Sequence, residues 1–281
     1  MRLRFDDHDR DALGMTYVYP VVSRRARGVS IGINLNPNNA CNWRCVYCQV
    51  PDLTQGKAPP VDLALLEEEL TAMLERLVHS DWMERNVPEG SRRLNDIAFS
   101  GNGEPTSADA FPEVVALVRR KLDAFPSLAP TKLVLITNGS LVHLEHVQRG
   151  LVHLAAGRGE VWFKLDGGTD AFLARFNGDR VGAQRRERNL ALAARLAPTW
   201  VQTMALAWNG EPPPEREREA YLALLGRVLA GGSRLEGVHL YGLARPSHQV
   251  EAPDLSPLDP AWMEAFADRI RALGLEVTVS V

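Results

Sequence analysis

Short apolar runs and longer amphipathic stretches alternate along the chain. The apolar runs have the length of buried strands, and they cover 31–35, 97–99, 133–136, 161–165, 200–206, 237–241 and 275–281. Between them, apolar residues recur at three- and four-residue steps, as in helices that bury one face. The stretches with this period predict helices at 62–79, 109–124, 142–154, 183–197, 215–230 and 260–273. Strands that alternate with helices across short loops predict an α/β protein with a parallel sheet.

The number of repeating units limits the architecture. About six strand–helix units and a terminal strand fall short of the eight units of a closed barrel. We therefore expect an open, partial (β/α)6 barrel, with an N-terminal extension at 1–28 and a single-domain core at 29–281. A flat, doubly wound sheet built from the same alternation is the alternative.

The composition supports a sizeable hydrophobic core and says little about binding partners. The chain has 281 residues, of which 45% are hydrophobic, and its formal net charge is -3, so no global positive field indicates nucleic acid. The run Arg185-Arg186-Glu187-Arg188 is most simply a solvated helix face. No apolar run approaches the ~20 residues that cross a bilayer, and the first ten residues lack the apolar core of a signal peptide. We expect a soluble, cytoplasmic protein.

All three cysteines lie close together, as Cys41-Asn-Trp-Arg-Cys45-Val-Tyr-Cys48. Three thiolates can hold three irons of a 4Fe-4S cluster and leave the fourth iron open to a small chelating molecule. A structural zinc site is the alternative, but it needs a fourth ligand, and His8 and His79 are distant in sequence. Disulfides are disfavoured by the odd number of cysteines and the lack of a signal peptide. The loop predicts an iron–sulfur site.

Polar residues follow several other strands, at the carboxyl edge where parallel α/β proteins bind ligands. The second strand runs into Ser100-Gly101-Asn102-Gly103-Glu104-Pro105, whose glycines allow close approach of a ligand, although an ordinary turn has the same composition. The third strand ends at Asn138, and the fifth carries Gln202. On the fourth, Lys164 and Asp166 share one face, and buried charges of this kind either pair with each other or serve a site.

These features together resemble the radical S-adenosylmethionine (SAM) superfamily. The resemblance rests on the Cys41-x3-Cys45-x2-Cys48 spacing with Tyr47 before the last cysteine, and on 101–105, which looks like the superfamily's Gly-Gly-Glu element. It covers nearly the whole chain. The segments at 30–35 and 42–49 are similar to the iron–sulfur oxidoreductase branch that includes the wyosine-forming tRNA enzymes.

The resemblance implies a partial barrel, a 4Fe-4S cluster and SAM as cofactors. Cys41, Cys45 and Cys48 would be the metal ligands and the catalytic centre, and the amino and carboxylate groups of SAM would chelate the open iron. By similarity, Tyr47 contacts the adenine, and Gly101, Asn102, Gly103 and Glu104 contact the methionine amino group. Asn138, Lys164 and Asp166 contact the ribose or carboxylate, and Gln202 belongs to the same cofactor-binding set. A flavodoxin- or ferredoxin-type reductant is implied.

The resemblance also implies an activity: reductive cleavage of SAM to a 5′-deoxyadenosyl radical, which abstracts hydrogen from a substrate. The branch resemblance favours an RNA base. A peptide or protein is the alternative substrate, including a partner enzyme activated by a glycyl radical, and a non-enzymatic iron–sulfur or zinc protein is a third reading. Wyosine-forming relatives carry further cysteines for a second cluster, and this sequence has none to spare.

Overall fold

The computed structural model describes residues 3, 13–23 and 28–281. Within the expected N-terminal extension at 1–28, residues 1–2, 4–12 and 24–27 lie outside the described residues, His8 among them, and the boundary between extension and core stays a prediction. None of the helices that the structure describes is both long and apolar enough to span a bilayer.

One eight-stranded sheet forms the centre of the molecule. Its order is β1-β2-β5-β6-β7-β8-β10-β12. The bounds are β1 (Val18–Ser23), β2 (Gly28–Ile33), β5 (Leu94–Phe99), β6 (Lys132–Thr137), β7 (Gly159–Lys164), β8 (Thr199–Met204), β10 (Gly237–Tyr241) and β12 (Val277–Ser280). β1 pairs antiparallel with β2, and every other pairing in this sheet is parallel. The parallel strands match the predicted apolar runs.

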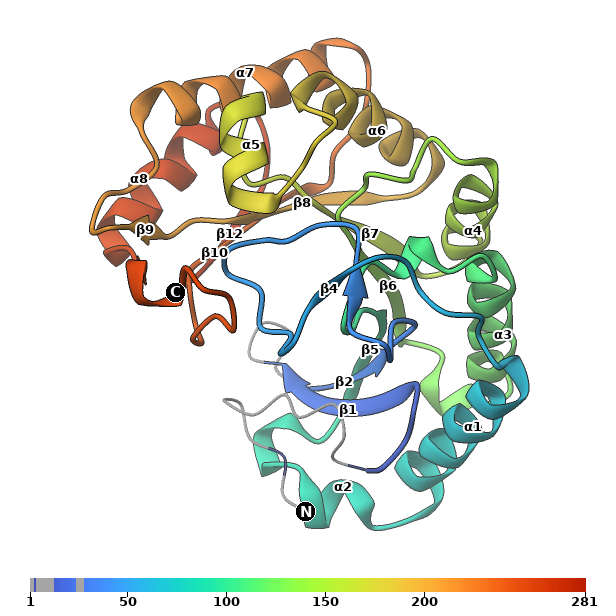
Figure 1. Ribbon diagram of the computed structural model, residues 1–281. Coiled ribbons are helices and arrows are strands. Elements are labelled where there is room, and N and C mark those ends of the chain that lie inside the picture. Colours follow the sequence, from blue (N-terminus) through green and yellow to red (C-terminus); the bar gives the residue numbers. More distant parts are fainter. Residues whose placement is uncertain (1–2, 4–12, 24–27) are drawn as a thin grey trace.

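Helices cover the outside of this sheet. They are α1 (Leu63–His79), α2 (Trp82–Asn86), α3 (Phe111–Asp123), α4 (Glu145–Ala155), α5 (Asp170–Asn177), α6 (Ala183–Leu196), α7 (Glu215–Ala230) and α8 (Pro260–Arg271). In Figure 1, α1, α3, α4, α6, α7 and α8 follow one another in an arc around the curved sheet. The partial barrel is therefore confirmed, and the doubly wound alternative, with helices on both faces, is wrong.

The main core lies between the sheet and this arc of helices. On β7, Val161 and Phe163 are buried in that core, whereas Trp162 points to the concave side, where its ring lies 4.8 Å from the ring of His239 on β10. β8 separates these two strands in the sheet, so the contact crosses the inside of the barrel. The predicted period of two on this strand is confirmed, and it directs the polar side chains inward.

Two small pairings hold the loops at the strand ends. β3 (Ala40–Cys41) pairs with β4 (Thr54–Gln55), and β9 (Ala207–Trp208) pairs with β11 (Leu255–Ser256). The first of these pairings anchors the start of the cysteine loop. Because parallel strands end at a common edge, the loops after β2, β5, β6 and β7 meet there.

Candidate functional site

The cysteine loop follows β2 and turns tightly between its second and third cysteine. The amide of Cys48 donates to the carbonyl of Cys45 at 3.0 Å, and all three thiols are free and half-buried. The amide of Trp43 donates to Cys41 Sγ at 3.5 Å, and Asn177 Nδ2 donates to Cys45 Sγ at 3.4 Å. The sulfur atoms are thus held by the loop itself and by the end of α5.

The donor set suits an iron–sulfur cluster in number and in softness. Among the described residues, no group of three or more His, Cys, Asp or Glu side chains gathers as a metal site, so convergence of the thiols on one cluster stays a prediction. Burial raises the pKa of Cys41 to about 12 and the pKa of Cys45 to about 11. Both thiols are therefore protonated at neutral pH, and cluster binding must displace their protons.

The segment after β10 holds the cysteine loop from the far side of the barrel. Ser247 Oγ donates to the carbonyl of Val46 at 2.7 Å and lies 3.1 Å from the carbonyl of Cys48. The amide of His248 also donates to the Cys48 carbonyl, at 2.8 Å. Backbone groups of the loop are therefore fixed by a segment about two hundred residues away in sequence.

Glu104 joins the loop after β5 to the end of β6. Its side chain is 2% exposed. Oε1 accepts from the hydroxyls of Thr106 and Thr137, both at 2.6 Å, and from the amide of Thr106 at 3.1 Å. Oε2 accepts from the amide of Asn138 at 2.6 Å. The carboxylate thus orders two strand ends, and its predicted contact with a methionine amino group stays a prediction.

Gly101 and Gly103 let the same loop pack against the segment that leads into the cysteines. A Cβ on Gly103 would lie 2.0 Å from the carbonyl oxygen of Ala40, and one on Gly101 would lie 2.3 Å from Asn34 Oδ1. The amide of Asn102 donates to that same Asn34 oxygen at 3.0 Å. Glycine is required here by backbone packing, whichever ligand binds.

Asn138 reaches the cysteine loop directly. Its Nδ2 donates to Oδ1 of Asn42 at 2.8 Å, and Asn42 Nδ2 donates to Ser140 Oγ at 2.8 Å. Ser140 closes the network by donating from its hydroxyl to Asn138 Oδ1 at 2.7 Å. The third strand end is therefore connected to the residue that follows Cys41, as the sequence predicts for a shared site.

Lys164 and Asp166 bond to different partners. Lys164 Nζ donates to the hydroxyl of Tyr241 at 3.0 Å and lies 5.0 Å from the ring centroid of Tyr47. Asp166 accepts from the hydroxyl of Tyr47, from Asn177 Nδ2 at 2.7 Å and from the amide of Met204 at 2.8 Å. Among the described residues, Lys164 and Asp166 form no direct ion pair with each other; each is hydrogen-bonded to other groups, and the Asp166 carboxylate acts on Lys164 only through space.

Tyr47 is buried, and its ring packs 5.3 Å from that of Phe176. Burial, followed by the nearby Asp166 carboxylate, raises the pKa of its hydroxyl well above the usual value. Tyr47 therefore stays a neutral hydrogen-bond donor. Its predicted stacking on adenine stays a prediction.

Two buried amide oxygens are left without a partner among the described residues: Oε1 of Gln202 and Oδ1 of Asn177. Gln202 is 3% exposed and sits beside Lys164 in the register of β7 and β8. Buried polar atoms in native proteins are nearly always hydrogen-bonded. These oxygens are thus suited to accept hydrogen bonds from the hydroxyl or amino groups of a ligand.

Asn177 and Arg186 touch this site, although the sequence did not predict them there. Asn177 ends a short helix that was not predicted, α5, and the Asn-Gly pair at 177–178 was its available signal. Arg186 was taken as part of a solvated face, which is wrong: it is fully buried. The signal was its spacing, because Arg186 shares a helix face with Asn189, Leu190 and Ala193, all of them buried.

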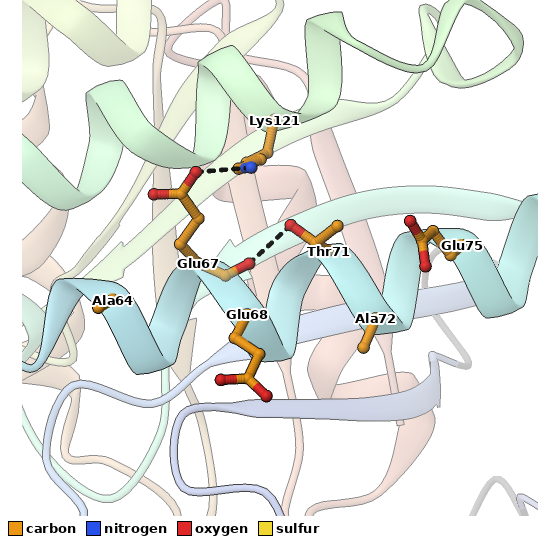
Figure 2. Close-up of a pocket in the computed structure, with 7 residues that line it drawn as sticks. All are labelled: Ala64, Glu67, Glu68, Thr71, Ala72, Glu75 and Lys121. Atoms are coloured by element: carbon orange, nitrogen blue, oxygen red, sulfur yellow. Dashed lines mark hydrogen bonds and ion pairs between the residues drawn. The ribbon is translucent and has the colours of Figure 1, made fainter.

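A pocket of about 480 Å³ lies elsewhere, on the outside of the barrel between α1 and α3 (Figure 2). It is lined by Ala64, Glu67, Glu68, Thr71, Ala72, Glu75 and Lys121. Lys121 Nζ pairs with Glu67 Oε1 at 2.6 Å across it. None of the predicted site residues belongs to this pocket.

No protein-family model matches the chain. The GTPase Obg of Brachyspira hyodysenteriae is 26% identical over 133 residues, which are 47% of this chain and only 17% of that protein. The present sequence has no Gly-x4-Gly-Lys-Ser/Thr phosphate-binding loop, so this similarity gives no support for a GTPase.

Two solved structures resemble nearly the whole chain. TYW1, a wyosine synthase solved with a lysine–pyruvate adduct bound, has a TM-score of 0.58 at 14% identity, over 88% of this chain and 74% of that one. A radical SAM methyltransferase from Sphaerobacter thermophilus has a TM-score of 0.58 at 15% identity, over 93% of this chain and 68% of that one. This chain therefore has the partial-barrel α/β fold of radical SAM enzymes.

Proposed function

We propose that this chain is a radical SAM enzyme. The observation that carries the proposal is the position of the Cys41-x3-Cys45-x2-Cys48 loop, which lies at the strand ends of this fold and is bonded to Asn138 at the end of β6 and to Asn177 at the end of α5. The three cysteines would hold a 4Fe-4S cluster, with SAM on the remaining iron. When bound, these cofactors supply one-electron cleavage of SAM to methionine and a 5′-deoxyadenosyl radical, which takes a hydrogen atom from the substrate.

The protein's own task is to hold SAM and to shield the reaction. The proposed cofactor-binding set is Tyr47, Gly101, Asn102, Gly103, Glu104, Asn138, Lys164, Asp166 and Gln202. Burial lowers the pKa of Lys164, but the nearby Tyr241 and Asp166 outweigh burial and raise it overall, so the ammonium stays charged. A charged Lys164 suits a carboxylate, and the free oxygens of Gln202 and Asn177 suit hydroxyl groups.

The lysine–pyruvate adduct in the TYW1 structure raises the question of a similar adduct here. Lys164 is the lysine of the proposed site, and a protonated amine is not a nucleophile. Because its pKa is raised and its Nζ donates to the hydroxyl of Tyr241, Lys164 is suited to bind an anion. We therefore assign it a binding role.

For the substrate, we favour an RNA base, on the resemblance to the wyosine-forming branch. A peptide or protein, including a glycyl-radical partner enzyme, is the second candidate. The sequence offers only three cysteines, so it has no thiols for a second cluster, which opposes the wyosine condensation itself. We further propose a flavodoxin- or ferredoxin-type reductant and a cytoplasmic location.

The test is anaerobic reconstitution with iron and sulfide, reduction with dithionite, and analysis of the products from SAM. We expect 5′-deoxyadenosine from the wild type and from Gln49→Ala, a matched control in the same loop, and none from Cys45→Ala. A wild type that carries four irons but makes no nucleoside would contradict the proposal. An electron paramagnetic resonance (EPR) signal of the cluster that does not change when SAM is added would indicate an electron carrier instead.

The substrate class needs a separate experiment. Nucleosides from the RNA of a deletion strain and its parent are compared by mass spectrometry. The RNA hypothesis expects one modified nucleoside to disappear in the deletion strain. An unchanged profile would move the second candidate, a peptide or protein, ahead of RNA.

A further inference from the structure

Arg186 is a buried charge that the proposed function leaves unused. It lies on α6 and is 0% exposed. The carbon of its guanidinium lies 4.4 Å from the ring centroid of Trp43 and 4.8 Å from that of Phe163. Trp43 stands between Cys41 and Cys45, so the guanidinium packs directly against the cysteine loop.

The polar contacts of Arg186 join two more loops to the same point. One guanidinium nitrogen donates to the carbonyl of Asn138, at the end of β6. Nε lies 3.8 Å from Oδ2 of Asp179, just after α5, which is an ion pair but too long for a hydrogen bond. Among the described residues, Nε and Nη2 of Arg186 and Oδ2 of Asp179 have no hydrogen-bond partner. One cation thus contacts the cysteine loop and the loops after β6 and α5.

The hydrogen bonding of this cation is incomplete among the described residues. Burial lowers the pKa of Arg186 to about 10, against the opposing effect of Asp179, and the side chain therefore remains charged at neutral pH. Taking a charge out of water is costly unless good hydrogen bonds replace the lost solvent. The Asn138 carbonyl accepts a hydrogen bond from this cation, and the carboxylates of Asp179, Asp166 and Glu104 act on it through space. The Cys45 thiol lies within the same electrostatic reach of Arg186.

We propose that Arg186 is a positioning residue whose positive charge raises the reduction potential of the cluster held by Cys41, Cys45 and Cys48. The inference rests on the proposed function. Reduction adds one electron to the cluster, with no bond made or broken and no proton taken up. A fixed cation in a medium of low dielectric stabilises the more negative, reduced state, and net charge is one determinant of such potentials. The stack on Trp43 holds the charge and the loop together.

The experiment is a redox titration of the reconstituted protein without SAM, with dithionite as reductant and EPR as readout. Arg186→Met removes the charge at similar length, and we expect the ratio of reduced to oxidised cluster at a fixed potential to fall about tenfold, which is about 59 mV for one electron. Arg186→Lys keeps the charge and should stay much closer to the wild type. Arg185→Met, the exposed neighbour on the same helix, is the matched control and should leave the potential unchanged.

A second variant tests the direction of the shift in reduction potential. It leaves Arg186 in place, so it does not require the fold to accept another side chain there. Asp179→Asn removes the partner anion, so the ratio of reduced to oxidised cluster should rise. Suppose that Arg186→Met and Asp179→Asn both fold, take up the cluster and show the reduction potential of the wild type. The inference is then overturned, while the proposed function stands. If both shift in the same direction, the effect is structural and the inference again fails. If the wild type takes up no 4Fe-4S cluster, the proposed function fails and the inference falls with it.

Discussion

The guanidinium of Arg44 forms a two-pronged ion pair with the carboxylate of Glu251, which lies 207 positions further along the chain. Nη1 of Arg44 donates to Oε2 of Glu251 at 2.9 Å, and Nη2 pairs with Oε1. Arg44 belongs to the cysteine loop after β2, and Glu251 follows β10, near the other end of the sheet. The pair therefore fastens the cysteine loop across a barrel whose end strands, β1 and β12, do not pair.

Glu251→Gln should weaken this ion pair and so the link between the cysteine loop and the segment after β10. Since the Arg44 side chain is 43% exposed, the cost in unfolding free energy should be small, about 0.5–1 kcal/mol. The three thiols of the cluster-free protein should be alkylated faster. Glu264→Gln, which weakens the ion pair with Arg271 on α8, is the matched control and should not change thiol reactivity. Equal alkylation rates in the two variants would contradict the fastening.

Gly103→Ala should displace the loop after β5. The new Cβ would meet the carbonyl of Ala40, which is backbone and cannot rotate away, so we expect a loss of about 1–3 kcal/mol in unfolding free energy. Gly226→Ala is the control, since its Cβ meets nothing within 4 Å and alanine favours the helix α7, so stability should hold or rise. Thermal unfolding measures both, and a Gly103→Ala protein as stable as Gly226→Ala would disprove the close packing.

Glu104→Gln should lower the stability of the fold more than the same substitution does at an exposed position. The carboxylate accepts from four donors, and an amide in its place turns one acceptor into a donor facing other donors. We expect about 1–3 kcal/mol less stability in urea unfolding, because a buried donor is left unpaired. Glu68→Gln, on the exposed side of α1, provides the comparison. A stability loss no larger than that of Glu68→Gln would show that the network around Glu104 contributes little.

Tyr47→Phe removes the hydroxyl and keeps the ring, so it distinguishes the contribution of the hydrogen bond from that of the ring. Loss of the hydrogen bond to the Asp166 carboxylate should lower stability by about 1.5–3 kcal/mol in urea unfolding. If the ring stacks on adenine, the cluster-loaded Phe variant should bind SAM almost as the wild type does, and Tyr47→Leu should bind it several-fold more weakly. Equal binding by the Phe and Leu variants would remove Tyr47 from the adenine site.

Periodic patterns in the sequence predicted most of the fold. The alternation on β7 directed Trp162 and Lys164 inward, and the three- and four-residue steps at 62–79 predicted α1, whose N-cap Asp62 accepts from the amides of Ala64 and Leu65. β1 was not predicted. A proline in an apolar run weakens a strand prediction, and Pro20 is tolerated because β1 is an edge strand.

The site was predicted less completely than the fold. The order of strands and loops along the chain was enough to predict that the cysteines and the residues after each strand share one site, because parallel strands end at a common edge. The hydrogen-bond partners of these residues could not be predicted in this way. Asp166 accepts from Tyr47, Asn177 and Met204, on three separate elements, and no spacing in the sequence states which of them meet.

The complete burial of Arg186 has a consequence for measurements in different buffers. Mobile ions screen only the charges they can surround, with a Debye length of about 10 Å at 0.1 M ionic strength. Added potassium chloride should therefore weaken the Arg44–Glu251 contact at the surface and leave the influence of Arg186 on its surroundings almost untouched. The effect of Arg44, within the cysteine loop, and that of Arg186, which packs against the loop, can thus be told apart by ionic strength alone.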